Sequence, residues 1–158
     1  MKSSHFDKKG AARMVDISSK NITARKAIAS GKVYMKPETL YMIRQGNNKK
    51  GDVLAIARIA GIMSCKKTSD LIPLCHPITI DSVDIQFKLC DTENSIEITA
   101  SCKTSNKTGI EMEALTAVSV SGLTIYDMCK SVDKAMRIDA IQLVHKSGGK
   151  SGIYNKDD

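Results

Sequence analysis

The chain carries a histidine and several acids and bases at positions where the neighbouring sequence would hold them in place. His76 stands between Cys75 and Pro77 in residues 66–77, KKTSDLIPLCHP. Residues 109–134 are mostly apolar, and charged side chains are expensive to keep in such a stretch. The charges of interest in this second segment are Glu111, Glu113, Asp127 and Lys130. Together the two segments offer groups that can give and take protons.

His76 has two readings. An isolated histidine near apolar neighbours is more often a hydrogen-bonded structural residue than a catalyst. Pro73 and Pro77 favour a recognition role, because they exclude regular helix and lower the entropy cost of fixing one loop shape. We therefore expect a shaped loop around His76.

Each pair of charges also has an ordinary alternative. Glu111 and Glu113 would share a face only in an extended backbone, and in a helix they would diverge as a charged first turn, which the helix dipole favours. Asp127 and Lys130, three residues apart, can form a common ion pair on a helix surface. If that pair were partly buried, each group would shift the pKa of the other, as proton-transfer groups do.

Helix geometry limits how these groups can cooperate. Glu113 and Asp127 are fourteen residues apart, which puts them on nearly the same helical face but about 21 Å apart at 1.5 Å per residue. One small ligand cannot contact both residues of one chain. If both are functional, we expect a site shared between subunits.

The segment HKSGGKSG, residues 145–152, resembles a phosphate-binding loop but lacks the glycine spacing and the following helix of a P-loop. We instead expect residues 146–158 to be a mobile loop rich in glycine and lysine. In this interpretation Lys146 and Lys150 close on phosphates. A disordered tail is the alternative.

Size and charge favour a small anionic partner. The 158 residues suit one domain, predicted at residues 14–158 after a flexible arm at residues 1–13, in which we expect His5 to be uninvolved. The net charge of +7 and the pI near 9.2 indicate a polyanionic partner. With two Phe, four Tyr and no Trp, little can stack on single-stranded nucleic acid. A phosphate-bearing metabolite is therefore preferred, and a non-catalytic basic domain that binds nucleic acid is the alternative.

The five cysteines are scattered, without the paired spacing of a zinc site or of a disulfide framework. We expect no structural metal. No secretory leader and no apolar run long enough to span a membrane is visible. The sequence thus predicts a soluble, cytoplasmic protein without membrane contact.

In the first half of the chain, the pattern predicts an edge strand at residues 14–17. A helix should begin at Pro37 and be ended by Gly46. Asp52 is a good N-cap for a second helix, which should stop near residues 66–67.

In the second half, alternation predicts strands at residues 83–89 and 96–102 with a hairpin at residues 91–94. A long helix over residues 113–136 contains small residues that suggest close packing, and a last strand covers residues 138–144. This order indicates an α+β sandwich, in which an antiparallel sheet has long helices packed on one face.

In order and spacing, the motifs of this chain closely resemble those of the MoaC family, the cyclic pyranopterin monophosphate synthases of molybdenum cofactor biosynthesis. The matching segments are MVDI (14–17), KGD (50–52), KKTSDLIPLCHP (66–77), KTGIEMEA (107–114), LTIYDMCK (123–130) and KSGGKSG (146–152).

The resemblance implies a ferredoxin-like subunit that assembles as a hexamer of three dimers, with the active site at a subunit interface. It implies a lyase that uses general acid–base catalysis on 3′,8-cyclo-7,8-dihydro-GTP, which a radical SAM GTP cyclase supplies as functional partner. The products would be cyclic pyranopterin monophosphate and pyrophosphate. The protein would require no cofactor of its own, and magnesium could accompany the triphosphate. Another enzyme that acts on a purine triphosphate is a further alternative.

The resemblance also assigns roles to individual residues. Asp127 and Lys130 match the acid–base pair of the family, and Lys50 matches a further catalytic lysine. The remaining matches are substrate-binding positions: Leu74, Cys75, His76, Glu111, Met112, Glu113, Lys146 and Lys150.

Overall fold

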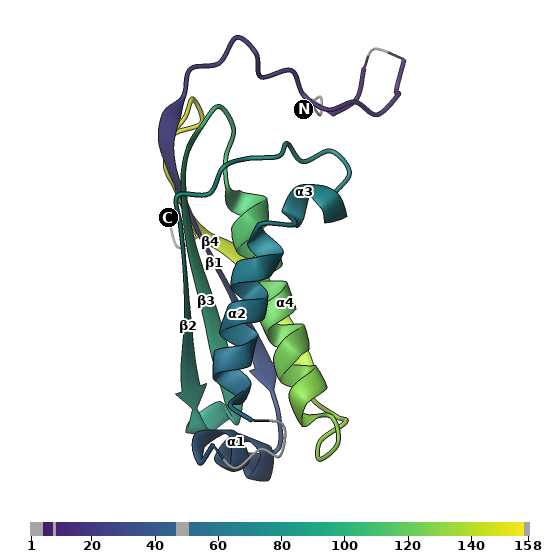
Figure 1. The fold of residues 1–158 in the computed structure, drawn as a ribbon, viewed down its shortest axis with the longest axis vertical. Helices are drawn as coiled ribbons and strands as arrows, with labels where there is room; N and C mark the ends of the chain where they lie inside the picture. Colours follow the sequence, from purple (N-terminus) through teal and green to yellow (C-terminus); the bar gives the residue numbers. More distant parts are fainter. Residues whose placement is uncertain (1–4, 8, 47–50, 157–158) are drawn as a thin grey trace.

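The computed structural model describes residues 5–7, 9–46 and 51–156. Within these ranges five strands form one antiparallel sheet in the order β2-β3-β1-β4-β5. The helices α2 (Val53–Cys65) and α4 (Glu111–Cys129) lie side by side over one face of the sheet (Figure 1). The succession is βαββαβ with a short strand added at one edge, which confirms the predicted α+β ferredoxin-like sandwich.

The central strand was not predicted from the sequence. The strands are β1 (Thr23–Tyr34), β2 (Ser82–Cys90), β3 (Ser95–Asn106), β4 (Arg137–Ser147) and β5 (Tyr154–Asn155). On β1 the residues facing the helices are small, among them Ala27, Ala29 and Gly31, so the apolar alternation is weak. The small size is needed, because a Cβ added to Gly31 would lie 2.7 Å from the Cγ1 of Val118 on α4.

The first two helices begin where the sequence predicts. Pro37 opens α1 (Pro37–Arg44), and the carboxylate of Asp52 caps α2 by accepting the backbone N–H groups of Leu54 and Ala55, both at 3.0 Å. Such a cap contributes about 1 kcal/mol to helix stability. No helix among the described residues is long and apolar enough to cross a membrane.

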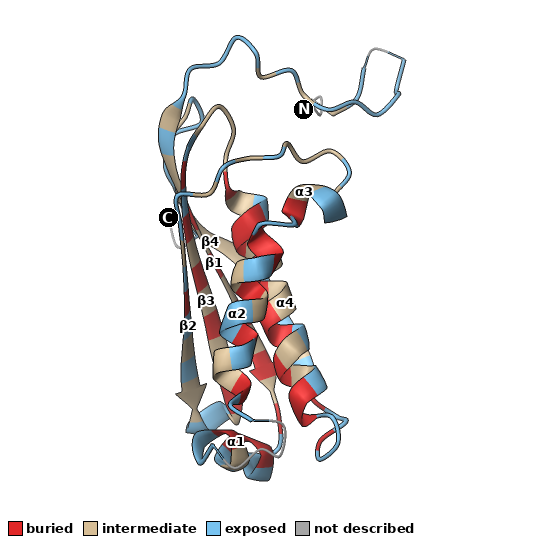
Figure 2. Ribbon diagram, viewed as in Figure 1, coloured by how far each residue is buried: buried red, intermediate tan, exposed pale blue. Residues whose placement is uncertain are grey.

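The contact between α2 and α4 depends on small residues, as the sequence suggested. The hydroxyl of Ser121 donates a hydrogen bond to the carbonyl oxygen of Ala57 at 3.1 Å. A Cβ on Gly61 would lie 3.1 Å from the carbonyl oxygen of Ala117. Figure 2 shows the buried residues gathered between the two helices and the sheet. The packing of these small and buried residues therefore sets the position of α4 on the sheet.

The predicted helix over residues 113–136 is wrong at its C-terminal end, because α4 stops at Cys129. Four residues later the buried carboxylate of Asp133 accepts hydrogen bonds from the backbone N–H of Lys36 at 2.8 Å and the hydroxyl of Thr39 at 3.2 Å. Burial alone would raise the pKa of Asp133, but these hydrogen bonds outweigh it and lower the pKa. The chain is thereby tied to the start of α1, so the helix cannot continue.

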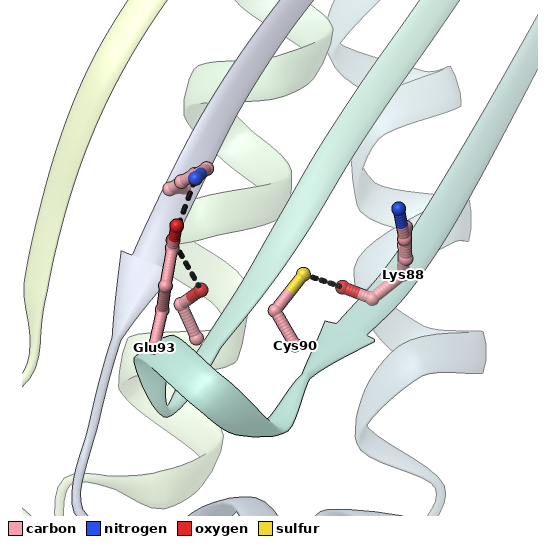
Figure 3. A network of polar contacts seen from close by, with 5 residues as sticks. Lys88, Cys90 and Glu93 are labelled. Carbon is pink, nitrogen blue, oxygen red and sulfur yellow. Dashed lines mark hydrogen bonds and ion pairs between the residues drawn. The ribbon is translucent and has the colours of Figure 1, made fainter.

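The hairpin between β2 and β3 is confirmed, with a short helical turn, η1 (Asp91–Glu93), at its tip. Asn94 closes the turn with a φ of 48°, in the left-handed region that Asn tolerates. The carboxylate of Glu93 accepts hydrogen bonds from Lys32 on β1 at 2.6 Å and from Ser95 at 3.5 Å (Figure 3). The turn is therefore fastened to the central strand.

The predicted edge strand at residues 14–17 is wrong, because this segment pairs with no strand. It runs as irregular chain, and its backbone is held by side chains instead. The ammonium of Lys107 donates to the carbonyl oxygen of Ser18 at 2.7 Å, and Asp16 accepts the backbone N–H of Ser18 at 2.8 Å. These bonds bring the N-terminal segment beside the turn that leads into α4.

Candidate functional site

A pocket of about 450 Å³ lies where α4 begins. It is lined by the N-terminal segment, the loop after α3 (Thr68–Leu71), the turn into α4 and the end of β4. Figure 1 shows these four segments meeting at the end of the molecule where α3 lies. Most of the site residues predicted from the sequence line this pocket: Leu74, Cys75, His76, Glu111, Met112, Glu113 and Lys146.

The loop around His76 has the shape that its prolines require. The short helix α3 was not predicted, and the chain after it is irregular across Pro73 and Pro77. The ring N–H at Nε2 of His76 donates a hydrogen bond to the carbonyl oxygen of Val15 at 2.8 Å. His76 thus holds the N-terminal segment, as the structural interpretation predicts, and it also lines the pocket. Its role in recognition stays a prediction.

Glu111 and Glu113 both lie in the first turn of α4, as the ordinary alternative predicted. They diverge, as helix geometry requires. The Glu111 carboxylate forms an ion pair with Lys146, and its side chain is 27% exposed. Glu113 is only 4% exposed. Two carboxylates of one pocket are therefore in different environments.

Burial raises the pKa of Glu113 to about 7, and the nearby charge of Glu111 adds to the rise, although a bond from its own backbone N–H acts in the opposite sense. Burial also raises the pKa of the Cys75 thiol, with the charge of Glu113 as a second cause. The backbone at Glu113 is held by Cys65, whose Sγ donates to the Glu113 carbonyl oxygen at 3.3 Å. At neutral pH the Glu113 carboxyl can consequently hold or release a proton, which general acid–base chemistry requires.

Lys146 reaches the pocket from β4. Its ammonium donates to Oε1 of Glu111 at 3.0 Å and to the hydroxyl of Ser151 at 2.8 Å. The side chain is 26% exposed, so water reaches the charge only in part. A lysine held in this way presents a positive charge to an anionic ligand in the pocket.

The chain after Lys146 folds back against the start of β1. Gly148 and Gly149 have φ angles of +91° and +74°, which favour glycine. A Cβ on Gly148 would lie 3.2 Å from the carbonyl carbon of Ala24, and one on Gly149 would lie 2.8 Å from Cζ of Arg25. Further on, β5 pairs with β4. The glycines thus permit close approach to β1, and the mobility expected of this loop stays a prediction.

Asp127 and Lys130 lie at the other end of α4 and do not reach the pocket. Their ion pair measures 2.7 Å between Oδ1 and Nζ, and their side chains are 61% and 53% exposed. The Asp127 carboxylate raises the pKa of Lys130 by hydrogen bonding and by its charge. Within one chain this is the ordinary surface ion pair that the sequence left open.

Two further lysines were predicted as site residues. Lys50 lies outside the described residues. Lys150 lies exposed in the turn before β5. Their assigned roles stay predictions.

Other pocket residues were missed from the sequence. Lys20 supplies a second cation, and Thr108 and Gly109 form part of the turn into α4. His5, expected to be uninvolved, also lines the pocket. Lys20 follows the motif MVDI by only a few residues, in a segment for which the sequence predicts a sheet edge. The segment instead runs toward His76, and this path brings Lys20 to the pocket.

The pocket brings cations and carboxyl groups together in one place. Lys20 and Lys146 provide positive charge, and Glu113 provides a carboxyl group that titrates near neutral pH. Such a site can bind phosphate oxygens and move a proton in the same space.

Comparison with known proteins agrees with this chemistry. The family model described as the MoaC family matches residues 14–149. A Heliobacterium modesticaldum protein named cyclic pyranopterin monophosphate synthase is 56% identical over 154 residues, which cover 98% of this chain and 97% of that protein. A protein of the same name from Thermoanaerobacter sp. is 58% identical over 158 residues, covering 99% of each chain.

A third relative, from another genus, matches the chain to a similar degree. Cyclic pyranopterin monophosphate synthase 1 of Mycobacterium tuberculosis is 57% identical over 152 residues, which cover 96% of this chain and 89% of that protein. The family model covers every segment that lines the pocket except the part around His5. Because the family model spans most of the chain and the relatives match it nearly end to end, this chain belongs to the MoaC family.

Proposed function

We propose that this chain catalyses the conversion of 3′,8-cyclo-7,8-dihydro-GTP into cyclic pyranopterin monophosphate and pyrophosphate in molybdenum cofactor biosynthesis. The observation that carries the proposal is the meeting of three family motifs in one pocket, contributed by the His76 loop, the first turn of α4 and the end of β4. The name shared by close relatives supports the same reaction.

The reaction suits the groups in the pocket. A purine-derived ring must open and close again, which requires protons to be added and removed. The α-phosphate must then form a cyclic ester while pyrophosphate leaves, which requires positive charge near the phosphates. Glu113, with its pKa near 7, serves the first need, and Lys20 and Lys146 serve the second. Overall this is a phosphorus–oxygen lyase that works by general acid–base catalysis.

Lys50 serves as a further catalytic lysine in this proposal. Asp127 and Lys130 enter the proposed site from a second subunit. Fourteen residues of helix separate Glu113 from Asp127, a distance of about 21 Å along α4. A neighbouring subunit would bury the Asp127–Lys130 pair and so shift both pKa values, which catalysis by proton transfer needs.

The outer surface of the helical layer supports such an assembly. Several apolar side chains of α2 and α4 are exposed there, of the kind that subunit contacts cover. They are Ile56, Ile59, Met63 and Leu123. We propose the hexamer of three dimers that the family resemblance implies.

No redox cofactor is needed, because a radical SAM cyclase performs the preceding oxidation–reduction chemistry on GTP. Among the described residues no cluster of three or more His, Cys, Asp or Glu side chains is placed to hold a metal ion. Magnesium would therefore be bound mainly by the triphosphate itself and by water.

The test is to incubate the purified protein with 3′,8-cyclo-7,8-dihydro-GTP and to detect cyclic pyranopterin monophosphate and pyrophosphate by mass spectrometry. Lys146→Ala should reduce turnover strongly. Lys88→Ala, which removes the same charge from an exposed position on β2, is the matched control and should remain active.

The alternatives predict other outcomes. A basic domain that binds nucleic acid would give no product, and both lysine variants would lose salt-sensitive binding to DNA or RNA about equally. A different enzyme of purine triphosphates would leave the cyclised substrate intact and convert GTP or another purine triphosphate.

A further inference from the structure

Gly109 lies in the turn before α4 and lines the pocket. We propose that Gly109 is a positioning residue: because it has no side chain, the Glu111 carboxylate can fold back over the turn and hold Lys146 toward the ligand. This inference deepens the proposed function and rests on it for the identity of the ligand.

The geometry leaves no room for a larger residue while Glu111 keeps its position. A Cβ added to Gly109 would lie 2.6 Å from Cδ of Glu111 and 2.8 Å from its Oε1. Ordinary van der Waals contacts of a Cβ begin near 3.4 Å. Oε1 is the atom that accepts the hydrogen bond from Lys146 at 3.0 Å. The carboxylate that binds the lysine thus occupies the space that any side chain at position 109 would need.

The backbone does not explain the glycine. The φ angle of Gly109 is not positive, so an alanine can adopt the same backbone conformation. Gly148 is different, because it has a φ of +91° and an added Cβ would meet the backbone of Ala24. Replacing Gly148 must therefore move the main chain, whereas replacing Gly109 need only move the end of a flexible side chain.

The consequence falls on Lys146. Among the described residues its ammonium donates to the Glu111 carboxylate and to the hydroxyl of Ser151, and Ser151 is exposed. Without the carboxylate in place, the lysine is held by one solvent-exposed hydroxyl and samples more rotamers. Binding of a ligand must then order the Lys146 side chain, and this loss of conformational entropy lowers the affinity for phosphate.

A double-mutant cycle tests this coupling. Gly109→Ala, Glu111→Ala and the double variant are compared for KM and kcat with the cyclised substrate, and for binding of inorganic pyrophosphate by calorimetry. Gly109→Ala should raise KM and the pyrophosphate Kd about tenfold, the effect of losing about one charged hydrogen bond, and change kcat less. The double variant should be no weaker in binding than Glu111→Ala alone, because Gly109 acts through Glu111.

Two controls separate positioning from general damage. Gly109→Ala should unfold at the same denaturant concentration as the unchanged protein. Gly122→Ala, also a glycine without positive φ but within α4, should leave KM and the pyrophosphate Kd unchanged, since the atoms nearest to its added Cβ belong to Ile138 and Val33 and lie 3.2 Å or more away.

Additive losses in the double variant, or an unchanged pyrophosphate Kd in Gly109→Ala, would overturn the inference. Failure of the unchanged protein to bind pyrophosphate would overturn it as well. A third outcome separates this inference from the proposed function. If pyrophosphate binds and the effects of the two substitutions are not additive, but neither the unchanged protein nor any variant converts the cyclised substrate, the proposed function is wrong and the positioning role of Gly109 stands.

Discussion

At its first turn α4 buries the carboxyl group of Glu113, whereas at its last turn it leaves the carboxylate of Asp127 largely in water. The first group has a pKa near 7 because burial disfavours its charge. The second is paired with Lys130 in the solvent. One helix thus carries two acids of the same chemical type, of which its own chain buries one and leaves the other largely in water.

The difference comes from what covers each end of the helix. The His76 loop and the N-terminal segment enclose the first turn, and together with β4 they form the pocket. The last turn has no comparable cover among the described residues, and Leu123 and Val132 beside it are more than half exposed. We infer that the fold of one chain builds the pocket at the first end, and that the second end gains its cover when it meets the first end of another chain.

The largest expected effect is at the exposed end. Asp127→Ala or Lys130→Ala should abolish turnover and leave the unfolding midpoint nearly unchanged, because an exposed ion pair contributes little to stability. Turnover is measured by mass detection of the product, and stability by denaturant unfolding.

The pair Lys67–Asp70 offers a matched control, since it has the same three-residue spacing and similar exposure. Asp70→Ala should therefore keep its activity. Near-normal product formation by Asp127→Ala and Lys130→Ala would remove these two residues from the catalytic assignment.

A mixing experiment tests whether the two ends complete each other across subunits. His76→Ala and Asp127→Ala should each be inactive, and a mixture should regain part of the activity, because some mixed interfaces hold one intact set of residues. Native mass spectrometry of differently tagged chains must first show that subunits exchange. Mixed oligomers as inactive as either parent would contradict the division of the site between subunits.

The burial of Glu113 should make the free energy of unfolding depend on pH. The folded pKa of Glu113, about 7, lies above its ordinary value of 4.5. The folded state therefore favours the protonated form of Glu113. As pH rises from about 4.5 to about 7, the unfolded chain gives up this proton more readily than the folded protein, so the free energy of unfolding falls. Glu113→Gln, which mimics the protonated form, should gain on the order of 3 kcal/mol relative to the unchanged protein over that range and no more above it.

Urea unfolding between pH 4 and pH 9 measures this difference. Glu97→Gln, at a partly exposed position on β3, is the matched control and should show no comparable trend. A constant difference between the Glu113→Gln variant and the unchanged protein at all pH values would show that Glu113 titrates normally.

The smallest expected effect concerns the loop beside the pocket. A non-hydrolysable triphosphate analogue should slow trypsin cleavage after Lys150 severalfold, because Lys146 and Lys150 would close on its phosphates. Cleavage after Arg13, an exposed position in the N-terminal arm, serves as internal reference. Equal cleavage after Lys150 with and without saturating analogue would contradict ligand-induced closure.

Several elements follow from chemistry that acts over a few residues. Pro37 opens α1 and Asp52 caps α2, as expected, because a missing N–H and a carboxylate that accepts N–H groups work within one helical turn. The irregular loop between Pro73 and Pro77 follows from the same local rules. The two strands of the hairpin were visible because their alternation reflects burial of one face.

Other elements could not be predicted in this way. The central strand β1 escaped notice because it faces α4 with Ala and Gly, whose small size is required by a helix far away in the sequence. The end of α4 was placed too late because the reason for it, the hydrogen bonds of Asp133 to Lys36 and Thr39, joins residues almost a hundred positions apart. Residues 14–17 do not form the predicted strand because Val15 is held by His76, 61 positions away, a contact that the local pattern cannot show.

The motifs and their order were enough to recognise the family and to name most of the residues that line the pocket. Their individual properties were not legible, because the pKa of a carboxyl group depends on what surrounds it rather than on its neighbours in sequence. Glu111 and Glu113 are two residues apart and chemically identical. Only the packing of the loop, α4 and β4 decides that Glu111 pairs with Lys146, while Glu113 is buried with a pKa near 7.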